Sequence, residues 1–287
     1  MPRVALVTGG TRGIGEAICK ALQAAGYKVA ANYGGNDEAA QKFKAATGIA
    51  AYKWDVSSFE ACAAGVKQVE SDLGAVDVLV NNAGALGPLG PFWENDPDAW
   101  WRAMDINLRA HLLCTHSVLP EMISRGRGRI INISSGAGVA PIANFPAYVT
   151  AKTALGRFTE NLAAETKPHG ISVFAIAPGT VRTALAEYSL NSPEGQKWIP
   201  WFRRIFDEGL VSPPERPAQL VLALASGIAD AISGRCISVY DDLNLVIENA
   251  AEVERDALYC LRVRKLAAEK PNPVYANLLA VAGRTHS

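Results

Sequence analysis

Short apolar runs alternate along the chain with longer amphipathic stretches. The runs lie at residues 4–7, 28–33, 76–80, 129–133, 171–176 and 236–240, and each is followed by glycine, asparagine, serine or proline within a few residues. Short runs of this kind, separated by helical stretches, indicate parallel strands joined by helices. The sequence therefore predicts an α/β fold in which a doubly wound parallel sheet carries helices on both faces.

A glycine-rich turn follows the first expected strand. Residues 8–15 read Thr-Gly-Gly-Thr-Arg-Gly-Ile-Gly, and residues 16–25 read as a helix that Gly26 ends. Glycines in this context let the backbone turn tightly and approach a diphosphate, while the helix N-terminus offers free N–H groups. We interpret the turn as a Rossmann-type dinucleotide site. The alternative is a tight turn with no ligand.

Tyr148 and Lys152 are four residues apart, so on a helix they share a face. A nearby ammonium favours the phenolate, so we expect the pKa of Tyr148 to fall from about 10. Ser135 follows the expected strand 129–133, where ligands bind in open α/β sheets. These residues predict a general acid and a hydroxyl that holds the substrate oxygen, whereas hydride must come from a cofactor. The alternative is a solvated tyrosine and lysine on a surface helix.

Several motifs together resemble the short-chain dehydrogenase/reductase family. They are the turn at 8–15, Asp55-Val56, the Asn-Asn-Ala-Gly run at 81–84, Asn107, Ser135, Tyr148-x-x-x-Lys152 and Pro178-Gly179. They occur in the family's order and span residues 1 to about 240. The resemblance implies that Tyr148 is the catalytic acid or base and that Lys152 lowers its pKa and holds the nicotinamide ribose. It further implies that Ser135, rather than Ser134, orients the carbonyl and that Asn107 holds a water in a proton relay.

The resemblance also implies a set of cofactor-binding residues. Asp55 would contact the adenine, residues 82–84 the adenosine side, and residues 178–183 the nicotinamide. The full set is Gly9, Thr11, Arg12, Gly13, Ile14, Gly15, Tyr33, Asp55, Val56, Asn82, Ala83, Gly84, Tyr148, Lys152, Pro178, Gly179, Val181 and Thr183.

The second strand, residues 28–33, ends without an acid. A carboxylate there would bind the ribose 2′-OH of NAD and repel a 2′-phosphate. Asp37 and Glu38 come later and suit the first turn of the next helix. Arg12 could pair with a 2′-phosphate, so the sequence favours NADP(H) and leaves NAD(H) open. The alternative for Arg12 is a solvated surface side chain.

We expect a catalytic domain at residues 1–245 with a substrate lid at about 183–213, and a helical extension at residues 246–287. The lid region is rich in aromatic residues, which suit either an apolar substrate or packing against the core or another subunit. In the extension, residues 244–270 predict an amphipathic helix whose apolar side chains include Leu258, Leu261, Val263 and Leu266. We expect it to be ordered to at least Lys270, packed on its own domain or on a partner subunit.

Composition narrows the functional classes. The 287 residues carry no formal net charge, so there is no electrostatic case for nucleic acid or an anionic membrane. We expect a cytoplasmic protein, because the chain enters its first strand at once and its five cysteines are scattered. The histidines show no metal-ligand spacing and are interpreted as structural. The family resemblance implies a homodimer or homotetramer.

The sequence thus predicts an NADP(H)-dependent oxidoreductase acting on a small carbonyl or secondary alcohol. Residues 1–84 resemble the acetoacetyl-CoA reductases in particular, and after Gly84 the pattern becomes more generic, so the thioester substrate is not carried over. A 3-oxoacyl thioester reductase is the alternative enzyme. A dinucleotide-binding sensor without turnover is the alternative outside the enzymes.

Overall fold

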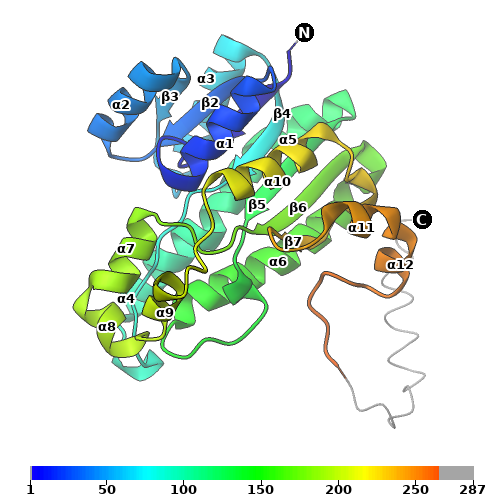
Figure 1. Cartoon of the computed structure of the whole chain (residues 1–287). Coiled ribbons are helices and arrows are strands. Elements are labelled where there is room, and N and C mark those ends of the chain that lie inside the picture. The colour runs from blue at the N-terminus through cyan, green and yellow to red at the C-terminus, as the bar shows by residue number, and fades with distance from the viewer. Residues whose placement is uncertain (1, 265–287) are drawn as a thin grey trace.

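The structure is a computed structural model that describes residues 2–264 (Figure 1). Within these residues, one parallel sheet of seven strands has the order β3-β2-β1-β4-β5-β6-β7. The strands are β1 Val4–Val7, β2 Lys28–Tyr33, β3 Ala50–Lys53, β4 Val76–Asn81, β5 Gly128–Ile133, β6 Ile171–Ala177 and β7 Cys236–Ser238. The predicted doubly wound α/β fold is confirmed. β3 was not predicted, because its side chains are only half-buried and form no apolar run.

Helices cover both faces of the sheet. They are α1 Gly13–Ala24, α2 Asp37–Thr47, α3 Phe59–Leu73, α4 Pro97–Met104, α5 Ala110–Arg125, α6 Pro146–Thr166, α7 Ala184–Asn191, α8 Pro193–Trp198, α9 Phe202–Asp207, α10 Glu215–Ser226, α11 Leu243–Glu248 and α12 Ala250–Arg255. Single turns are η1 Phe92–Glu94, the π-helical η2 Asp105–Arg109, η3 Gly136–Gly138, η4 Lys167–His169 and η5 Asp230–Ile232. As expected, Asp37 and Glu38 lie in the first turn of α2.

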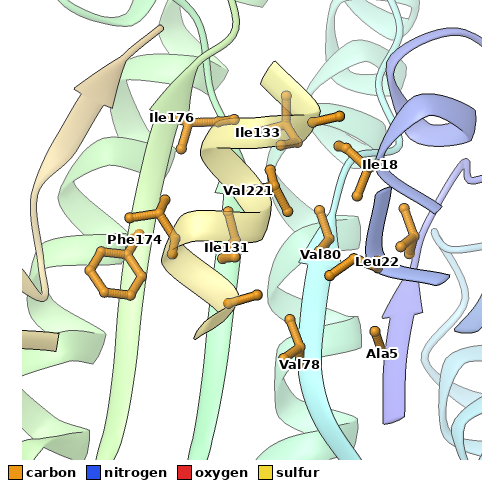
Figure 2. Close-up of a cluster of buried hydrophobic side chains, with 14 of the residues drawn as sticks. Ala5, Ile18, Leu22, Val78, Val80, Ile131, Ile133, Phe174, Ile176 and Val221 are labelled. Atoms are coloured by element: carbon orange, nitrogen blue, oxygen red, sulfur yellow. The ribbon is translucent and has the colours of Figure 1, made fainter. Parts of the chain in front are cut away.

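The core has two layers, one on each side of the sheet. One layer brings α1 and α10 onto the sheet, and Figure 2 shows Val221 of α10 and Ile18 of α1 pointing toward Val80 and Ile131. The other layer brings α3, α5 and α6 onto the opposite face. Strands buried on both faces account for the continuous apolar runs in the sequence.

The strand order reverses between β1 and β4. β1 pairs with β2 on one side and with β4 on the other, and both pairings are parallel. At such a switch point the connections leave the sheet in opposite directions and open a crevice at the carboxyl ends of the strands. The glycine turn after β1 and the loop after β4 therefore meet at this crevice. The short helices α7, α8 and α9 lie within the expected lid region and group together at one end of the sheet (Figure 1).

The C-terminal extension is helical as predicted, but it does not form the single helix expected over residues 244–270. The chain instead forms the two short helices α11 and α12, and the residues described after Arg255 are not helical. Ala257 and Tyr259 have positive φ angles of 50° and 58°, which an α-helix does not accommodate. Residues 265–270 lie outside the described part of the chain.

The extension is nevertheless anchored to the domain. Its buried apolar residues are Val246 and Val253, each 3% exposed, whereas Leu258 is 40% exposed and Val263 is 90% exposed. The backbone N–H of Cys236 in β7 donates to the carbonyl of Tyr259 over 2.9 Å. Within residues 246–264, the contacts with the domain therefore come from α11, α12 and this edge contact, whereas Leu258 and Val263 are exposed.

Candidate active site

A cavity of about 1340 Å³ lies at the carboxyl ends of the strands. It is larger than the roughly 300–1,000 Å³ of most small-ligand pockets, so it has room for a dinucleotide and a substrate. The predicted residues that line it are Gly9, Thr11, Arg12, Gly13, Ile14, Gly15, Tyr33, Val56, Asn82, Ala83, Gly84, Asn107, Ser135, Tyr148, Lys152, Pro178, Gly179, Val181 and Thr183. The structure thus brings the glycine turn and the candidate catalytic residues to one cavity.

Asp55 is the predicted residue that does not line this cavity. Its carboxylate accepts hydrogen bonds from the backbone N–H of Ser57 at 2.9 Å and from the Ser57 hydroxyl at 2.7 Å. These two bonds lower the pKa of Asp55. Its neighbour Val56 does line the cavity, so an adenine contact through Asp55 stays a prediction.

The glycine turn forms a tight cradle at the start of α1. Gly9 and Gly13 have positive φ angles of 60° and 56°. A Cβ atom on Gly15 would lie 2.2 Å from the carbonyl oxygen of Gly9, so this position requires glycine. Asn82 closes the cradle, because its side-chain amide donates to the carbonyls of Thr8 at 2.9 Å and Gly9 at 3.1 Å. An open helix N-terminus behind a glycine turn fits a dinucleotide diphosphate.

The polar side chains at and after the end of β2 already have hydrogen-bond or ion-pair partners within the protein. Asn32 accepts from the backbone N–H of Gly9 at 3.3 Å and donates to the carbonyl of Trp54 at 3.1 Å. The nearest acid, Asp37, accepts from the Tyr33 hydroxyl at 3.1 Å and pairs with Lys53 at 2.7 Å. The exposed Arg12 lines the cavity and forms no ion pair within residues 2–264.

The candidate acid–base group is built on α6 and the end of β5. The Tyr148 ring stacks on Phe145 with centroids 4.8 Å apart and an interplanar angle of 7°. One turn further along α6, the Lys152 ammonium donates to the carbonyl of Ile133 over 2.8 Å. Ser134 donates its hydroxyl to the carbonyl of Lys152, whereas Ser135 accepts from the backbone N–H of Ala137. Ser134 is therefore used by the backbone of α6, whereas the Ser135 hydroxyl lies at the cavity and is hydrogen-bonded with Tyr148.

The predicted effect of Lys152 on Tyr148 is wrong for this structure. Burial raises the pKa of Tyr148, and the hydrogen bond with Ser135 opposes that rise. Burial also lowers the pKa of Lys152 to about 7. Removing both groups from water disfavours the phenolate and the ammonium alike, and Lys152 does not lower the pKa of Tyr148. Tyr148 is therefore protonated at neutral pH, which suits a proton donor.

Asn107 lies in the π-helical turn η2 and is fully buried. Its side-chain amide donates to the carbonyls of Ala85 at 2.7 Å and Ala103 at 2.9 Å, and its oxygen accepts from the N–H of Ala85 at 3.2 Å. Single π-turns inside helices often mark functional positions. Here the turn ties the loop after β4 to the cavity wall.

The cavity wall around Phe145, Tyr148 and Phe202 is largely apolar, and sequence reasoning found only part of it. Trp201 and Phe202, within the expected lid region, line the cavity. Additional lining residues are Leu86, Ile142, Phe145, Leu185, Ile205, Leu210, Ser212, Arg216 and Tyr240. Phe145 could have been found, because it lies three residues before Tyr148 at the start of the same expected helix. The others come from segments far apart in sequence and carry no motif.

Other aromatic residues of the loop after β4, of α4 and of the lid region do not line the cavity. The indole of Trp198 packs beside Gly90. Phe92, Trp93 and Trp101 are 68%, 83% and 63% exposed. The aromatic residues of these segments therefore have different surroundings, and only some of them line the cavity.

Two features are absent from residues 2–264. No group of His, Cys, Asp and Glu side chains is arranged to hold a metal ion. No helix there is both long and apolar enough to cross a membrane.

Comparison with known proteins gives the family. The short chain dehydrogenase model matches residues 3–193. An acetoacetyl-CoA reductase of Shinella zoogloeoides is 47% identical over 238 residues, which cover 83% of this chain and 97% of that protein. Its counterpart in Rhizobium meliloti is 45% identical with the same coverage. The alignment with these reductases runs far beyond residue 84, so the similarity is not confined to the first part of the chain.

Solved structures of reductases have the same fold as this chain. Levodione reductase superposes with a TM-score of 0.76 at 28% identity, covering 82% of this chain and 95% of that one. An actinorhodin polyketide ketoreductase solved with NADPH superposes with a TM-score of 0.74 at 30% identity, covering 83% and 95%. The chain therefore belongs to the short chain dehydrogenases and is a nicotinamide-dependent oxidoreductase acting on a carbonyl or alcohol group.

Proposed function

We propose that this chain is an NADP(H)-dependent reductase of small carbonyl compounds and that Tyr148 is its general acid. The observation that carries the proposal is the shared cavity. The glycine cradle, Ser135, Tyr148 and Lys152 all line it. A cofactor whose diphosphate lies on the cradle can therefore share one cavity with a carbonyl held near Tyr148.

Each residue of the site has a separate role in the proposed reaction. The bound nicotinamide supplies the hydride. Ser135 donates a hydrogen bond to the substrate oxygen and orients it toward Tyr148. Tyr148, which burial keeps protonated, delivers its proton to that oxygen as the negative charge develops. Lys152, whose Nζ atom is 5.6 Å from the centre of the Tyr148 ring, would hold the nicotinamide ribose. The apolar wall around Phe145 and Phe202 excludes water.

The preference for NADP(H) rests on charge at the end of β2. A 2′-phosphate would meet no free carboxylate there, because Asp37 is held by Tyr33 and Lys53. Arg12 lines the cavity, as Tyr33 and Gly34 do, and can give a charge-assisted bond to a phosphate. This arrangement favours the phosphorylated cofactor over NAD(H).

A 3-oxoacyl thioester is the second candidate substrate, and the acetoacetyl-CoA reductases among the relatives favour it. A thioester carrier brings phosphates that need basic partners. In the lid, Arg204 is paired with Glu208 at 2.8 Å and Arg182 with Glu187 at 2.6 Å. Arg216 also lines the cavity, where it stacks on Tyr240, and it pairs with no carboxylate in the described chain. Arg216 is thus the basic group best placed for a carrier phosphate.

The test is an NADPH-oxidation assay with simple ketones, aldehydes and acetoacetyl-CoA, run in parallel on the unmodified chain and on Tyr148→Phe. The variant keeps the ring but lacks the proton donor, so turnover should fall by about 10² to 10⁴ while NADPH affinity is retained. NADH in place of NADPH should give a lower kcat/KM. Normal turnover by Tyr148→Phe would overturn the catalytic assignment. Reduction of acetoacetyl-CoA alone would select the thioester candidate.

A further inference from the structure

Two buried cysteines, Cys62 of α3 and Cys114 of α5, meet on the face of the sheet opposite α1 and α10. Both belong to the core layer that α3, α5 and α6 form, and both are 0% exposed. Their Sγ atoms are 3.6 Å apart, so the two sulfur atoms are in contact. The residues are 52 positions apart in the sequence, and only the packing of α3 against α5 brings the two thiols together.

The two thiols form a chain of hydrogen bonds that ends at the cavity wall. Cys62 donates to the carbonyl oxygen of Val56 over 3.3 Å, and Val56 lines the cavity. A thiol has one proton, so Cys114 is the donor in the contact between the two sulfurs. This hydrogen bond lowers the pKa of Cys62 and raises the pKa of Cys114. Cys62 is therefore the thiol that ionises first, and the thiolate is the reactive form.

Trp54 offers Cys62 a hydrogen-bond donor that the described residues leave unused. Its indole Nε1 atom is buried and has no hydrogen-bond partner in residues 2–264. The ring packs against α3 close to Cys62, because a Cβ atom on Gly65 would lie 2.5 Å from it. After the bond from Cys114, Trp54 is a further group that lowers the pKa of Cys62. A buried donor without a partner is costly, and a thiolate at Cys62 supplies the missing acceptor.

We propose that Cys62 and Cys114 are an oxidation site at which a peroxide forms a reversible disulfide, and that this disulfide weakens dinucleotide binding. The Cys62 thiolate attacks one oxygen of hydrogen peroxide and breaks the O–O bond, which gives a sulfenic acid and hydroxide. The Cys114 sulfur then attacks the sulfenic sulfur, and the S–S bond forms as the hydroxyl group leaves with the Cys114 proton as water. In total the two thiols lose two electrons and two protons, and one peroxide becomes two waters.

The disulfide acts on the cavity through Val56. It removes the thiol proton that Cys62 gives to the Val56 carbonyl. It also draws Cys62 toward α5, because the sulfurs must approach from 3.6 Å to about 2.05 Å. Val56 belongs to the cofactor-binding set expected from the sequence and lines the cavity, so its displacement disturbs the surface that a dinucleotide contacts. By reciprocity, a bound dinucleotide disfavours the disulfide by the same factor.

The other three cysteines differ from this pair. Cys19 of α1 is buried, has no thiol partner within residues 2–264, and its pKa is raised by burial. Cys236 and Cys260 are partly exposed, and the hydrogen bond from the Cys236 N–H to the Tyr259 carbonyl brings their backbones close together. A disulfide between Cys236 and Cys260 therefore has to be distinguished from the proposed one.

The test treats the full folded chain with hydrogen peroxide, alkylates the remaining thiols and digests the chain with trypsin without reductant. Cleavage after lysine and arginine releases residues 54–67 and 110–125, each of which contains one cysteine. We expect mass spectrometry to find these two peptides joined, and dithiothreitol to separate them. In fluorescence titrations the oxidised chain should bind NADPH about 3- to 10-fold more weakly, the order of one lost hydrogen bond. Dithiothreitol should restore the affinity.

Two substitutions separate the disulfide from other oxidative damage. Cys114→Ala keeps Cys62 but lacks the thiol that closes the disulfide, so peroxide should cause no loss of NADPH affinity that dithiothreitol reverses. Cys19→Ala also removes a buried thiol and is the matched control, and it should respond to peroxide as the unmodified chain does. If Cys114→Ala does not fold, the peptide mapping and the titrations of the unmodified chain decide the question, and neither measurement needs turnover.

Three results overturn the proposal. In the first, peptides 54–67 and 110–125 stay separate in the folded chain or join only after it is unfolded. In the second, peroxide links Cys236 to Cys260 alone. In the third, the chain with the 54–67 and 110–125 peptides joined binds NADPH as tightly as the reduced chain does.

Discussion

At the scale of single residues, burial decides the charge states in this site. Tyr148 and Lys152 share a helix face, as their spacing predicted, but sequence spacing contains no measure of burial. Lys152 is 3% exposed, and burial lowers its pKa from 10.5 to about 7. Since one pKa unit corresponds to about 1.4 kcal/mol, burying this ammonium costs about 5 kcal/mol below pH 7.

This cost has a defined pH window. The penalty is complete below the folded-state pKa of about 7 and disappears above the unfolded value of 10.5, so Lys152 makes the fold more stable as pH rises between them. We expect Lys152→Met to raise the free energy of unfolding at pH 6, and its advantage to shrink steadily toward pH 10. Denaturant titrations at several pH values measure it. The exposed Lys67→Met is the control and should show no such trend, and a pH-independent gain for Lys152→Met would contradict the assignment.

Arg12 is the residue on which the choice of cofactor depends most directly. It is exposed, lines the cavity and has no carboxylate partner in the described chain. A charge-assisted bond to a 2′-phosphate is worth about 1.5 to 3 kcal/mol, or roughly 10- to 150-fold in affinity. Arg12→Ala should therefore weaken NADPH binding by that factor and barely change NADH binding, as measured by nicotinamide fluorescence titration. Equal losses for both cofactors would mean that Arg12 only shapes the glycine turn.

At the scale of elements, the sequence predicted the strands that are buried along their whole length and the helix that follows a recognisable motif. β1, β4, β5 and β6 are almost wholly buried, so each left an unbroken apolar run. α1 was placed correctly because its glycine turn has a physical requirement at Gly15, where a side chain would strike the Gly9 carbonyl. β3 lacked both signals, because it is half-exposed and has no motif beside it.

The C-terminal extension shows how an element can be misjudged. Its charged and apolar residues alternate with a helical period, yet the chain stops being helical after Arg255. Tertiary contacts favour the end of the helix at this point. Tyr259, in a left-handed conformation, places its carbonyl on the outer N–H of β7, and Arg157 of α6 donates to the carbonyl of Leu261 at 2.7 Å. Periodicity cannot anticipate a backbone bond to a strand more than twenty residues earlier.

At the scale of the whole molecule, the substrate end of the cavity is where sequence reasoning reaches least far. The cofactor side and the acid–base group rest on compact motifs, and the structure brings them together as expected. The apolar wall instead collects Leu86 from the loop after β4, Phe145 from the start of α6, and Phe202 from α9. Only the folded chain brings these segments together, which is why substrate identity was left open and has to be settled by assay.

The extension's contribution to the whole domain can be measured by removing it. Deleting residues 246–287 removes the buried side chains of Val246 and Val253. Burial of each valine contributes about 1.5 to 3 kcal/mol to stability. It also removes Glu254, which pairs at 2.7 Å with the buried Arg235 and whose loss leaves an uncompensated charge. We expect a clear fall in melting temperature.

Light scattering on the same truncated chain checks whether the extension also takes part in assembly. Two substitutions in the full chain calibrate the stability effect. Val246→Ala should lower the melting temperature in part, whereas Leu245→Ala, at a side chain that is 56% exposed, should not. If the truncated chain kept its melting temperature, its assembly and its substrate profile, the contacts of α11 and α12 with the core would contribute nothing to the fold. The extension would then be a passive appendage, despite the burial of its two valines.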